Sequence, residues 1–252
     1  MKKSRQTSLE EEHHPEAIRR RLNAPNKVQT VPDAILGGID GCVTTFAVVS
    51  GAFGAGFSAS VALVLGFANL LADGFSMAVS NYESIQAQQE HIDGVRESER
   101  HHIEQVPEGE REELRQIFRL KGFDGDMLER VVDIISQDRT VWVETMLTEE
   151  HGLQTQALSP LRSAATTFVA FLIVGMMPLL PYTLASLNAT QQFLASLMVA
   201  GLMFFLIGML KSVVYQRPIL QSGLRTLLMG GAAAGLAFVT GHLAHAWFGV
   251  GI

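Results

Sequence analysis

Two aspartates stand within stretches of the chain that are otherwise free of charge. Asp40 and Asp73 are separated by 32 residues without an Asp, Glu, Lys or Arg. An acid at the centre of a bilayer costs about 2.5–3.5 kcal/mol on insertion scales and usually serves a function. No Lys or Arg lies within the expected spans, so a proton, a metal ion or a helix N-terminus must supply the countercharge. The alternative is a structural role, with each Asp protonated or hydrogen-bonded between helices.

Helical spacing extends this pattern along two faces. Asn69, Asp73 and Met77 recur every four residues and share one face of a helix, while Thr44 follows Asp40 by one turn. Oxygen ligands next to a thioether suit a borderline divalent ion such as Fe²⁺ or Mn²⁺, although a lone Met is ordinarily core packing. Asp33 adds an acid at the expected cytoplasmic mouth. The candidate ion path comprises Asp33, Asp40, Thr44, Asn69, Asp73 and Met77.

A second set of potential ligands lies in residues 83–159. This segment holds 18 Asp and Glu against eight Lys and Arg, a local net charge of −10. Carboxylates three or four residues apart on facing helices are how helical bundles build metal sites. A solvated acidic surface is the alternative. The residues with this spacing are Glu99 and His102, Glu110 and Glu113, and Met146 and Glu150.

The elements that must position these residues are apolar stretches long enough to cross a membrane, for which about 20 residues are needed. Charged residues make up 17% of the 252-residue chain, below the roughly 25% of soluble domains. The single cysteine, Cys42, excludes a disulfide scaffold and a Cys-based zinc site. Five spans are expected, at about 34–55, 59–81, 164–184, 193–210 and 226–248.

Charge predicts the orientation of these spans. The N-terminal tail and the link between the fourth and fifth spans are basic, whereas the two short turns carry no Lys or Arg. The positive-inside rule therefore places the N-terminus, the acidic insertion and that link in the cytoplasm. The expected organisation is a polar tail (1–30) without a cleaved signal, two spans (31–82), a helical metal-binding domain (83–159) and three spans (160–252).

Helix signals divide the insertion further. The second span has no proline up to Gln105 and is expected to continue as one long helix. A second helix should start at Pro107 and end near residue 120. Asp124 and Asp138 are expected to cap two more helices, the last of which stops at Gly152. In the tail, residues 15–22 are either a short helix on the membrane surface or part of a solvated tail.

Small residues at four-residue spacing indicate where helices approach closely. Gly37 and Gly41 form one such pair in the first span, and Gly231 and Gly235 form another in the fifth. Pairs of this kind are typical of packed membrane helices. They predict helix contacts and no chemistry of their own.

Four sequence pieces, in this order, resemble the vacuolar iron transporter family. They are DAILGGIDG (33–41), LLADGFSMAVSNY (70–82), ESERHHIEQVPEGEREEL (97–114) and MLTEEHGL (146–153). The resemblance runs from about Val31 through nearly the whole chain, and its specificity lies in the order of the pieces within five spans and one acidic insertion.

The resemblance implies a homodimer with the ion path between its two copies, which moves Fe²⁺ or Mn²⁺ outward in exchange for protons. By this likeness Asp40 and Met77 match the intramembrane transport residues, and Asp33 matches the cytoplasmic entrance. The residues that match the ligands of the family's cytoplasmic metal-binding domain are Glu99, Glu110, Glu113, Met146 and Glu150.

Three positions depart from the family pattern. Asn69 stands where a Glu is expected, and Asp73, one turn further on, is the candidate replacement. His102 stands where the first insertion pair has its second Glu. Leu147 stands where a second Met is common. These departures bear on which ion is carried and leave the transport class unchanged.

The sequence therefore predicts an all-α integral membrane protein that exports Fe²⁺ or Mn²⁺ by proton antiport. A passive metal channel and a membrane-anchored metal buffer or sensor are the alternatives. No enzyme is expected, because G-x-S-x-G, P-loop and HExxH motifs are absent from the sequence. The expected partners are divalent ions, protons, lipid and a second copy, with no nucleic acid and no cofactor beyond transported or regulatory metal. The membrane would be the plasma (inner) membrane in a bacterium or a vacuolar-type membrane in a eukaryote.

Overall fold

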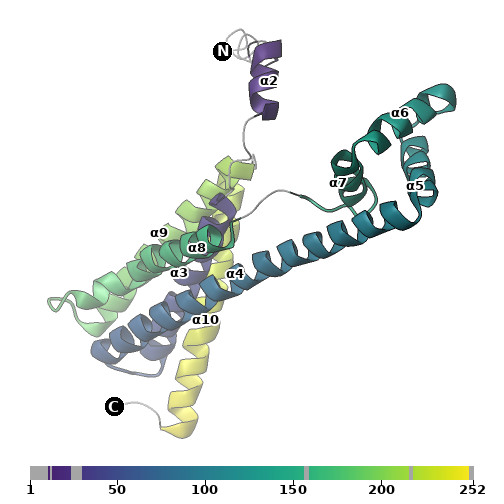
Figure 1. Ribbon diagram of the computed structural model, residues 1–252. Coiled ribbons are helices and arrows are strands. Elements are labelled where there is room, and N and C mark those ends of the chain that lie inside the picture. The colour runs from purple at the N-terminus through teal and green to yellow at the C-terminus, as the bar shows by residue number, and fades with distance from the viewer. Residues whose placement is uncertain (1–10, 12, 24–29, 156–158, 216–217, 250–252) are drawn as a thin grey trace.

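The computed structural model describes residues 11, 13–23, 30–155, 159–215 and 218–249, and the regular structure of these residues is helical (Figure 1). Five helices are long and apolar enough to cross a membrane. The prediction of an all-α protein with five spans is therefore confirmed. The elements are α2 (Pro15–Asn23), α3 (Val31–Gly54), α4 (Ala59–Gln105), α5 (Pro107–Leu120), α6 (Gly125–Gln137), α7 (Arg139–Glu149), α8 (Pro160–Met176), η1 (Met177–Thr183), α9 (Ala189–Tyr215) and α10 (Ile219–Phe248).

The ends of the first two spans follow from local sequence. Pro32 lies in the first turn of α3, where its missing N–H costs no hydrogen bond. Gly56 adopts a φ of 75° in the turn after α3, a conformation that favours glycine. Ser58 then caps α4, because its hydroxyl accepts a hydrogen bond of 3.5 Å from the backbone N–H of Val61. The turn expected between these spans is confirmed.

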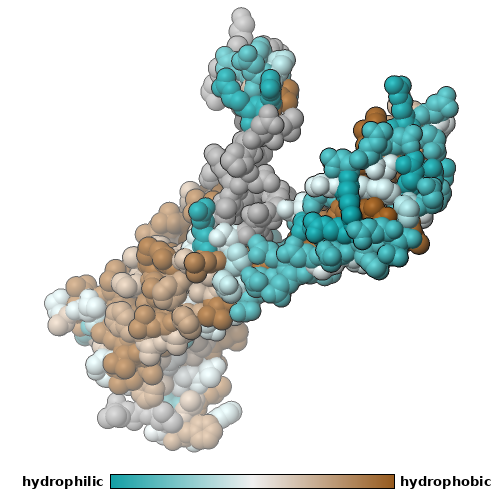
Figure 2. Space-filling model, viewed as in Figure 1, coloured by the Kyte–Doolittle hydropathy of each residue, from teal (hydrophilic) through white to brown (hydrophobic). Residues whose placement is uncertain are grey.

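The helix α4 is 47 residues long and leaves the bundle as a single continuous rod (Figure 1). Its apolar first half packs against α3 and α8. Its polar second half contacts α5 and α7, and α6 packs on those two helices. Figure 2 shows the change in hydropathy along it, from brown surface over the bundle to teal over the projecting part. The continuation to Gln105 was predicted correctly, and the boundary expected between residues 82 and 83 falls inside the helix.

Prolines set the end of the third span. The α-helix α8 gives way to the 3-10 helix η1, which contains Pro178 and Pro181 and ends at Thr183. Proline removes a backbone donor and cannot continue an α-helix. The chain then reverses before α9, whose neighbours in the bundle are η1, α3 and α10.

Glycines allow the closest helix contacts of the bundle. A Cβ added at Gly37 would lie 2.2 Å from the carbonyl oxygen of Thr167, and one at Gly41 would lie 2.5 Å from that of Phe171. The first glycine pair therefore mediates the crossing of α3 and α8, as predicted. A Cβ at Gly231 or Gly235 meets nothing within 4 Å in the described residues, so the second pair makes no such contact within the chain.

The helices of the insertion enclose a small apolar core of their own. Leu114, Val132 and Leu147 are fully buried there, from α5, α6 and α7. Asp138 caps α7 as predicted, since its Oδ1 accepts hydrogen bonds from the backbone N–H groups of Thr140 and Val141 at 2.8 and 3.2 Å. Two details differ from the prediction. The side chain preceding α6, Asp124, makes no capping hydrogen bond, and α7 ends at Glu149 rather than near residue 152.

Candidate metal sites

The acid expected at the entrance is held by a hydrogen-bonded amide. The Asn81 side chain donates from Nδ2 to Oδ1 of Asp33 at 3.0 Å and to Oγ1 of Thr167 at 2.8 Å. These three residues belong to α4, α3 and α8, so the contact joins three helices. Asn81 was not among the predicted site residues. The sequence feature that could have identified it is its spacing, because Asn81 lies four residues after Met77 on the same helix face.

The two intramembrane acids lie on neighbouring helices. Asp40 of α3 and Asp73 of α4 are each half-buried and close enough for their charges to interact. The hydroxyl of Thr44 donates a hydrogen bond of 3.0 Å to the backbone carbonyl of Asp40. The sequence thus separates these carboxylates by 32 residues, and the packing of α3 on α4 brings them together.

The rest of the predicted path has two environments. Asn69 is half-buried, and its Nδ2 is shielded from solvent with no hydrogen-bond partner among the described residues. Met77 packs against the apolar core of the bundle. The amide nitrogen of Asn69 is therefore a shielded donor without a partner in the described part of the chain, one helical turn before Asp73.

In the insertion, two glutamates of different helices are buried side chains with unpaired oxygens. Glu99 of α4 and Glu110 of α5 are each 3% exposed. One carboxylate oxygen of each, Oε2, is shielded from solvent and has no hydrogen-bond partner among the residues that the structure describes. A buried polar group without a partner costs about 1–3 kcal/mol, and more when it is charged. An arrangement of this kind calls for a proton or a cation between the carboxylates.

Imidazoles flank the buried carboxylates. His102 Nδ1 lies 3.7 Å from Glu99 Oε1 and 3.5 Å from Glu110 Oε1. His151 Nε2 lies 3.1 Å from the same Glu99 oxygen and 3.7 Å from Glu150 Oε2. Glu99 is therefore common to two groups of three potential ligands, one with His102 and Glu110 and the other with His151 and Glu150.

Two carboxyl groups of the cluster, those of Glu110 and Glu150, have raised pKa values. Burial is the main cause that raises the pKa of Glu110 to about 7, and the negative charges of Glu113, Glu99 and Glu150 add to it. The pKa of Glu150 is raised by burial and by the charge of Glu113. Glu113 itself is exposed, so it contributes charge at the edge of the cluster.

Met146 occupies a different environment from the acids. Its side chain is fully buried in the apolar core of the insertion, together with Leu147. The structure thus brings four of the six predicted insertion residues into two contacting groups: Glu99, His102, Glu110 and Glu150. His151, which was not among the predicted site residues, joins them. The available signal was an imidazole next to a candidate ligand at the end of a helix.

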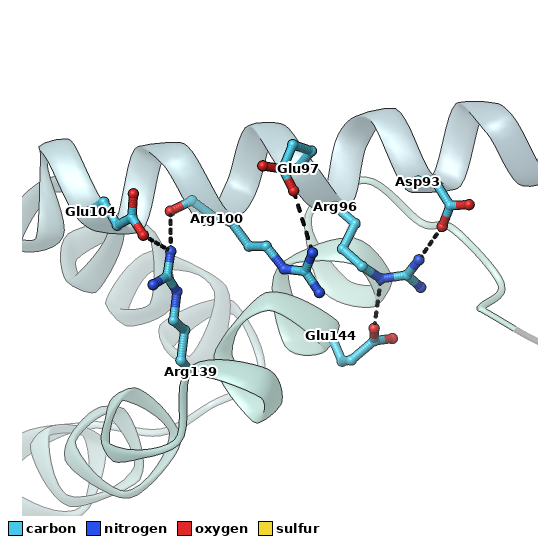
Figure 3. A network of polar contacts seen from close by, with 7 residues as sticks. All are labelled: Asp93, Arg96, Glu97, Arg100, Glu104, Arg139 and Glu144. Carbon is cyan, nitrogen blue, oxygen red and sulfur yellow. Dashed lines mark hydrogen bonds and ion pairs between the residues drawn. The ribbon is translucent and has the colours of Figure 1, made fainter.

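Other acids of the insertion are neutralised by arginines. Figure 3 shows side chains of α4 pointing toward α7, where Arg96 Nε donates to Glu144 Oε1 at 3.0 Å. Arg139 at the start of α7 bonds both Glu104 and the carbonyl oxygen of Arg100, the latter at 2.9 Å. These bonds fix α7 against α4, so they set the distance between Glu99 and the residues that follow α7. The metal-site candidates face histidines instead.

The fold and the two clusters define a multi-pass membrane protein with carboxylates placed both within its spans and on a helical insertion. The sequence profile of the VIT family matches residues 31–242. The chain belongs to this family, whose members are transporters and not enzymes.

Three relatives illustrate the similarity. The vacuolar iron transporter of Toxoplasma gondii (strain ATCC 50861 / VEG) is 30% identical over 222 residues, which cover 84% of this chain and 74% of the relative. That of Plasmodium berghei (strain Anka) is 32% identical over 219 residues, 83% of this chain and 80% of the relative. Vacuolar iron transporter 1 of Arabidopsis thaliana is 29% identical over 211 residues, which cover 83% of this chain and 84% of the relative.

Proposed function

We propose that this protein moves Fe²⁺, Mn²⁺ or both out of the cytoplasm in exchange for protons. The observation that carries the proposal is the neighbouring pair Asp40 and Asp73, in spans without a fixed positive charge. Two acids near each other within the spans need a cation, and either a proton or a metal ion serves. The vacuolar iron transporters similar to this chain supply the choice of iron as cargo.

The first step of the proposed mechanism is collection of the ion. With the N-terminus and the insertion in the cytoplasm, the cluster around Glu99 and Glu110 faces the cytoplasmic ion supply. Carboxylate and imidazole ligands bind Fe²⁺ and Mn²⁺, and the surrounding negative charge raises the local cation concentration. The exposed Glu113 contributes to that field.

The second step is entry and exchange. Asp33, held by Asn81, offers its carboxylate to the ion at the mouth of the path. Asp40 and Asp73 then accept the metal, with the Met77 thioether as an additional soft ligand. Because burial disfavours a bare carboxylate, the site is either metal-loaded or protonated. Protons from the far side displace the metal, which couples the two fluxes.

A second copy of the chain completes the path in this proposal. Asp40 and Asp73 are only half-buried in one protomer, which leaves them accessible to a neighbouring subunit. Such a homodimer would lie in the plasma (inner) membrane of a bacterium or in a vacuolar-type membrane of a eukaryote, with lipid around the apolar helix faces.

The test is ion uptake into proteoliposomes that hold the protein with its insertion facing outward. Fe²⁺, Mn²⁺, Co²⁺ and Zn²⁺ are added outside, with and without an imposed pH gradient. We expect uptake of Fe²⁺ or Mn²⁺ that accelerates when the lumen is acidic. Uptake that ignores the gradient would instead identify a passive channel. Binding without uptake would identify a metal buffer or sensor.

A further inference from the structure

The turn that follows α7 brings a histidine back to α4. The backbone N–H of His151 donates to the carbonyl oxygen of Met146 at 3.2 Å, and that of Leu153 donates to Leu147 at 2.9 Å. Gly152 between them has a φ of 64°, which only glycine adopts readily. Leu153 then packs against the apolar core of the insertion. The position of His151 is thus fixed by backbone hydrogen bonds and by packing on both sides.

The two imidazoles approach one carboxylate oxygen from different elements. His151 Nε2 and His102 Nδ1 lie 3.1 and 3.7 Å from Glu99 Oε1. His151 is 34% and His102 50% exposed at the side chain, whereas Glu99 is 4% exposed. The nitrogens are therefore open to incoming ions, while the carboxylate between them is shielded from water.

Unpaired buried oxygens mark this as more than a patch of surface acids. Glu99 Oε2 and Glu110 Oε2 are shielded from solvent and have no hydrogen-bond partner within the described ranges, and their side chains are more than nine-tenths buried. The ligand atoms of Glu99, Glu150 and His151 lie within 4.8 Å of one another, as do those of Glu99, His102 and Glu110. A single cation bound between the groups could contact nitrogen and oxygen ligands together.

We propose that His151 is a metal ligand of this chain and that, with His102, it gives the insertion a mixed nitrogen and oxygen ligand set. Imidazole suits iron, cobalt and zinc, whereas sites built only from carboxylates suit Mg²⁺, Ca²⁺ and Mn²⁺. The pair of histidines therefore selects borderline transition ions over Mg²⁺ and Ca²⁺. This inference deepens the proposed transport function, on which it rests, by naming the residues that discriminate among ions.

The competing role for His151 is that of a positive partner for the carboxylates, without a bond to metal. The two roles differ in one measurable property, the presence of histidine nitrogen in the coordination sphere. Pulsed electron paramagnetic resonance of bound Mn²⁺ detects such nitrogen directly. Full-length protein in detergent, with ¹⁵N-labelled histidine and less than one Mn²⁺ per chain, is the appropriate sample.

We expect a ¹⁵N coupling in the unsubstituted protein that weakens in His151→Gln and in His102→Gln and disappears in the double variant. His101→Gln is the matched control, because His101 is exposed on the same helix beside His102, and it should keep the full coupling. His151→Asp keeps a ligand but removes the nitrogen. It should bind Mn²⁺ with a weakened coupling, which keeps the test informative where the Gln variant folds poorly.

Calorimetry measures the selectivity. In His151→Gln the affinity for Co²⁺ should fall by about tenfold, in the range found when groups that support metal ligands are removed, while the affinity for Mg²⁺ falls less. An unchanged ¹⁵N coupling in His151→Gln, or equal losses of affinity for Co²⁺ and Mg²⁺, would overturn the proposal. Transport with an unchanged coupling would overturn this inference and leave the proposed function standing. A lost coupling in a protein that does not transport would support the ligand role and refute the function.

Discussion

The side-chain amide of Asn81 contacts Asp33 at 3.0 Å across 48 positions of sequence, and the same nitrogen contacts Thr167. The Asp33 carboxylate therefore has a fixed orientation before any ion arrives. A ligand that is already oriented loses less conformational entropy when the ion binds, so the entropic cost of binding is smaller. This contact leads to the first prediction.

We predict that Asn81→Ala slows metal uptake and lowers thermal stability. A hydrogen bond to a charged group contributes about 1.5–3 kcal/mol, so the loss should be visible in the melting temperature of the purified protein. Ser80→Ala is the control, because Ser80 is exposed on the adjacent position of α4. Equal uptake rates in the two variants would show that the amide does not position the acid.

The glycine pairs give a second prediction, about packing. Gly37→Ala places a methyl group 2.2 Å from a backbone oxygen of α8, and overpacking of this kind costs about 1–3 kcal/mol. Gly235→Ala meets open space and gains about 0.5–1 kcal/mol of helix propensity. The melting temperature of the protomer should therefore fall in the first variant and hold or rise in the second. A fall of the same size in both would contradict the assignment of the contact to the first pair.

Proton coupling gives a third prediction. Asp40→Asn keeps the shape of the side chain but removes the titrating proton, so metal-driven proton movement should be lost while expression stays near normal. A pH-sensitive dye trapped in proteoliposomes reports the proton movement when metal is added outside. A dye response equal to that of the unsubstituted protein would show that the carboxylate is structural.

Asp73 provides the companion experiment. If it has taken over the role of the Glu expected at Asn69, Asp73→Asn should reduce the dye response as severely as the substitution of Asp40. If it only hydrogen-bonds between helices, the response should remain and the melting temperature should fall. The dye response and the melting temperature together distinguish a role of Asp73 in proton coupling from a role in helix packing.

The pH dependence of the insertion gives a fourth prediction. The pKa of Glu110 is raised from 4.5 to about 7, so the folded chain keeps a proton that the unfolded chain releases between these values. The contribution of Glu110 to stability therefore falls as pH rises from 4.5 to about 7. In metal-free protein, Glu110→Gln should raise the melting temperature at pH 8 and have less effect at pH 4.5. The reverse order would exclude a buried, proton-holding Glu110.

The same proton competes with metal. Divalent-ion affinity, measured by calorimetry at constant ionic strength, should rise between pH 6 and pH 8 as Glu110 ionises. Replacing Glu110 and Glu113 together by Gln should lower the number of ions bound per chain. Unchanged stoichiometry would identify the acidic surface as solvated charge without a ligand role.

Orientation gives a fifth prediction. Ser58, Asn188 and Gln221 are exposed at the ends of spans, and the native thiol of Cys42 is fully buried. Cysteines introduced at Ser58 and Asn188 should react with impermeant reagents only from the non-cytoplasmic side, and one at Gln221 only from the cytoplasm. Labelling of all three from one side would contradict the five-span topology.

The helices and their ends were predictable from the sequence because they depend on local properties of the chain. Uninterrupted apolar length determined the five spans, and the lack of proline up to Gln105 determined the long helix α4. Proline and capping signals located α5 and α7 to within a few residues. The close helix contact at Gly37 and Gly41 was also predictable, since small residues at this spacing permit two helices to approach closely. The second pair in α10 has the same spacing but meets no neighbour in the part of the chain that the structure describes, because spacing does not say which helix face packs against another helix.

The sites depended on the tertiary structure. The sequence alone identified Asp40 and Asp73 as candidates, because they lie in apolar stretches free of other charges. It identified the insertion glutamates by their three- or four-residue spacing. It could not show that His151 lies beside Glu99 or that Asn81 reaches Asp33, since those distances follow from how α7 packs on α4 and how α4 packs on α3. Residue type and helical period are encoded locally, whereas the meeting of side chains 52 and 48 positions apart is decided by packing.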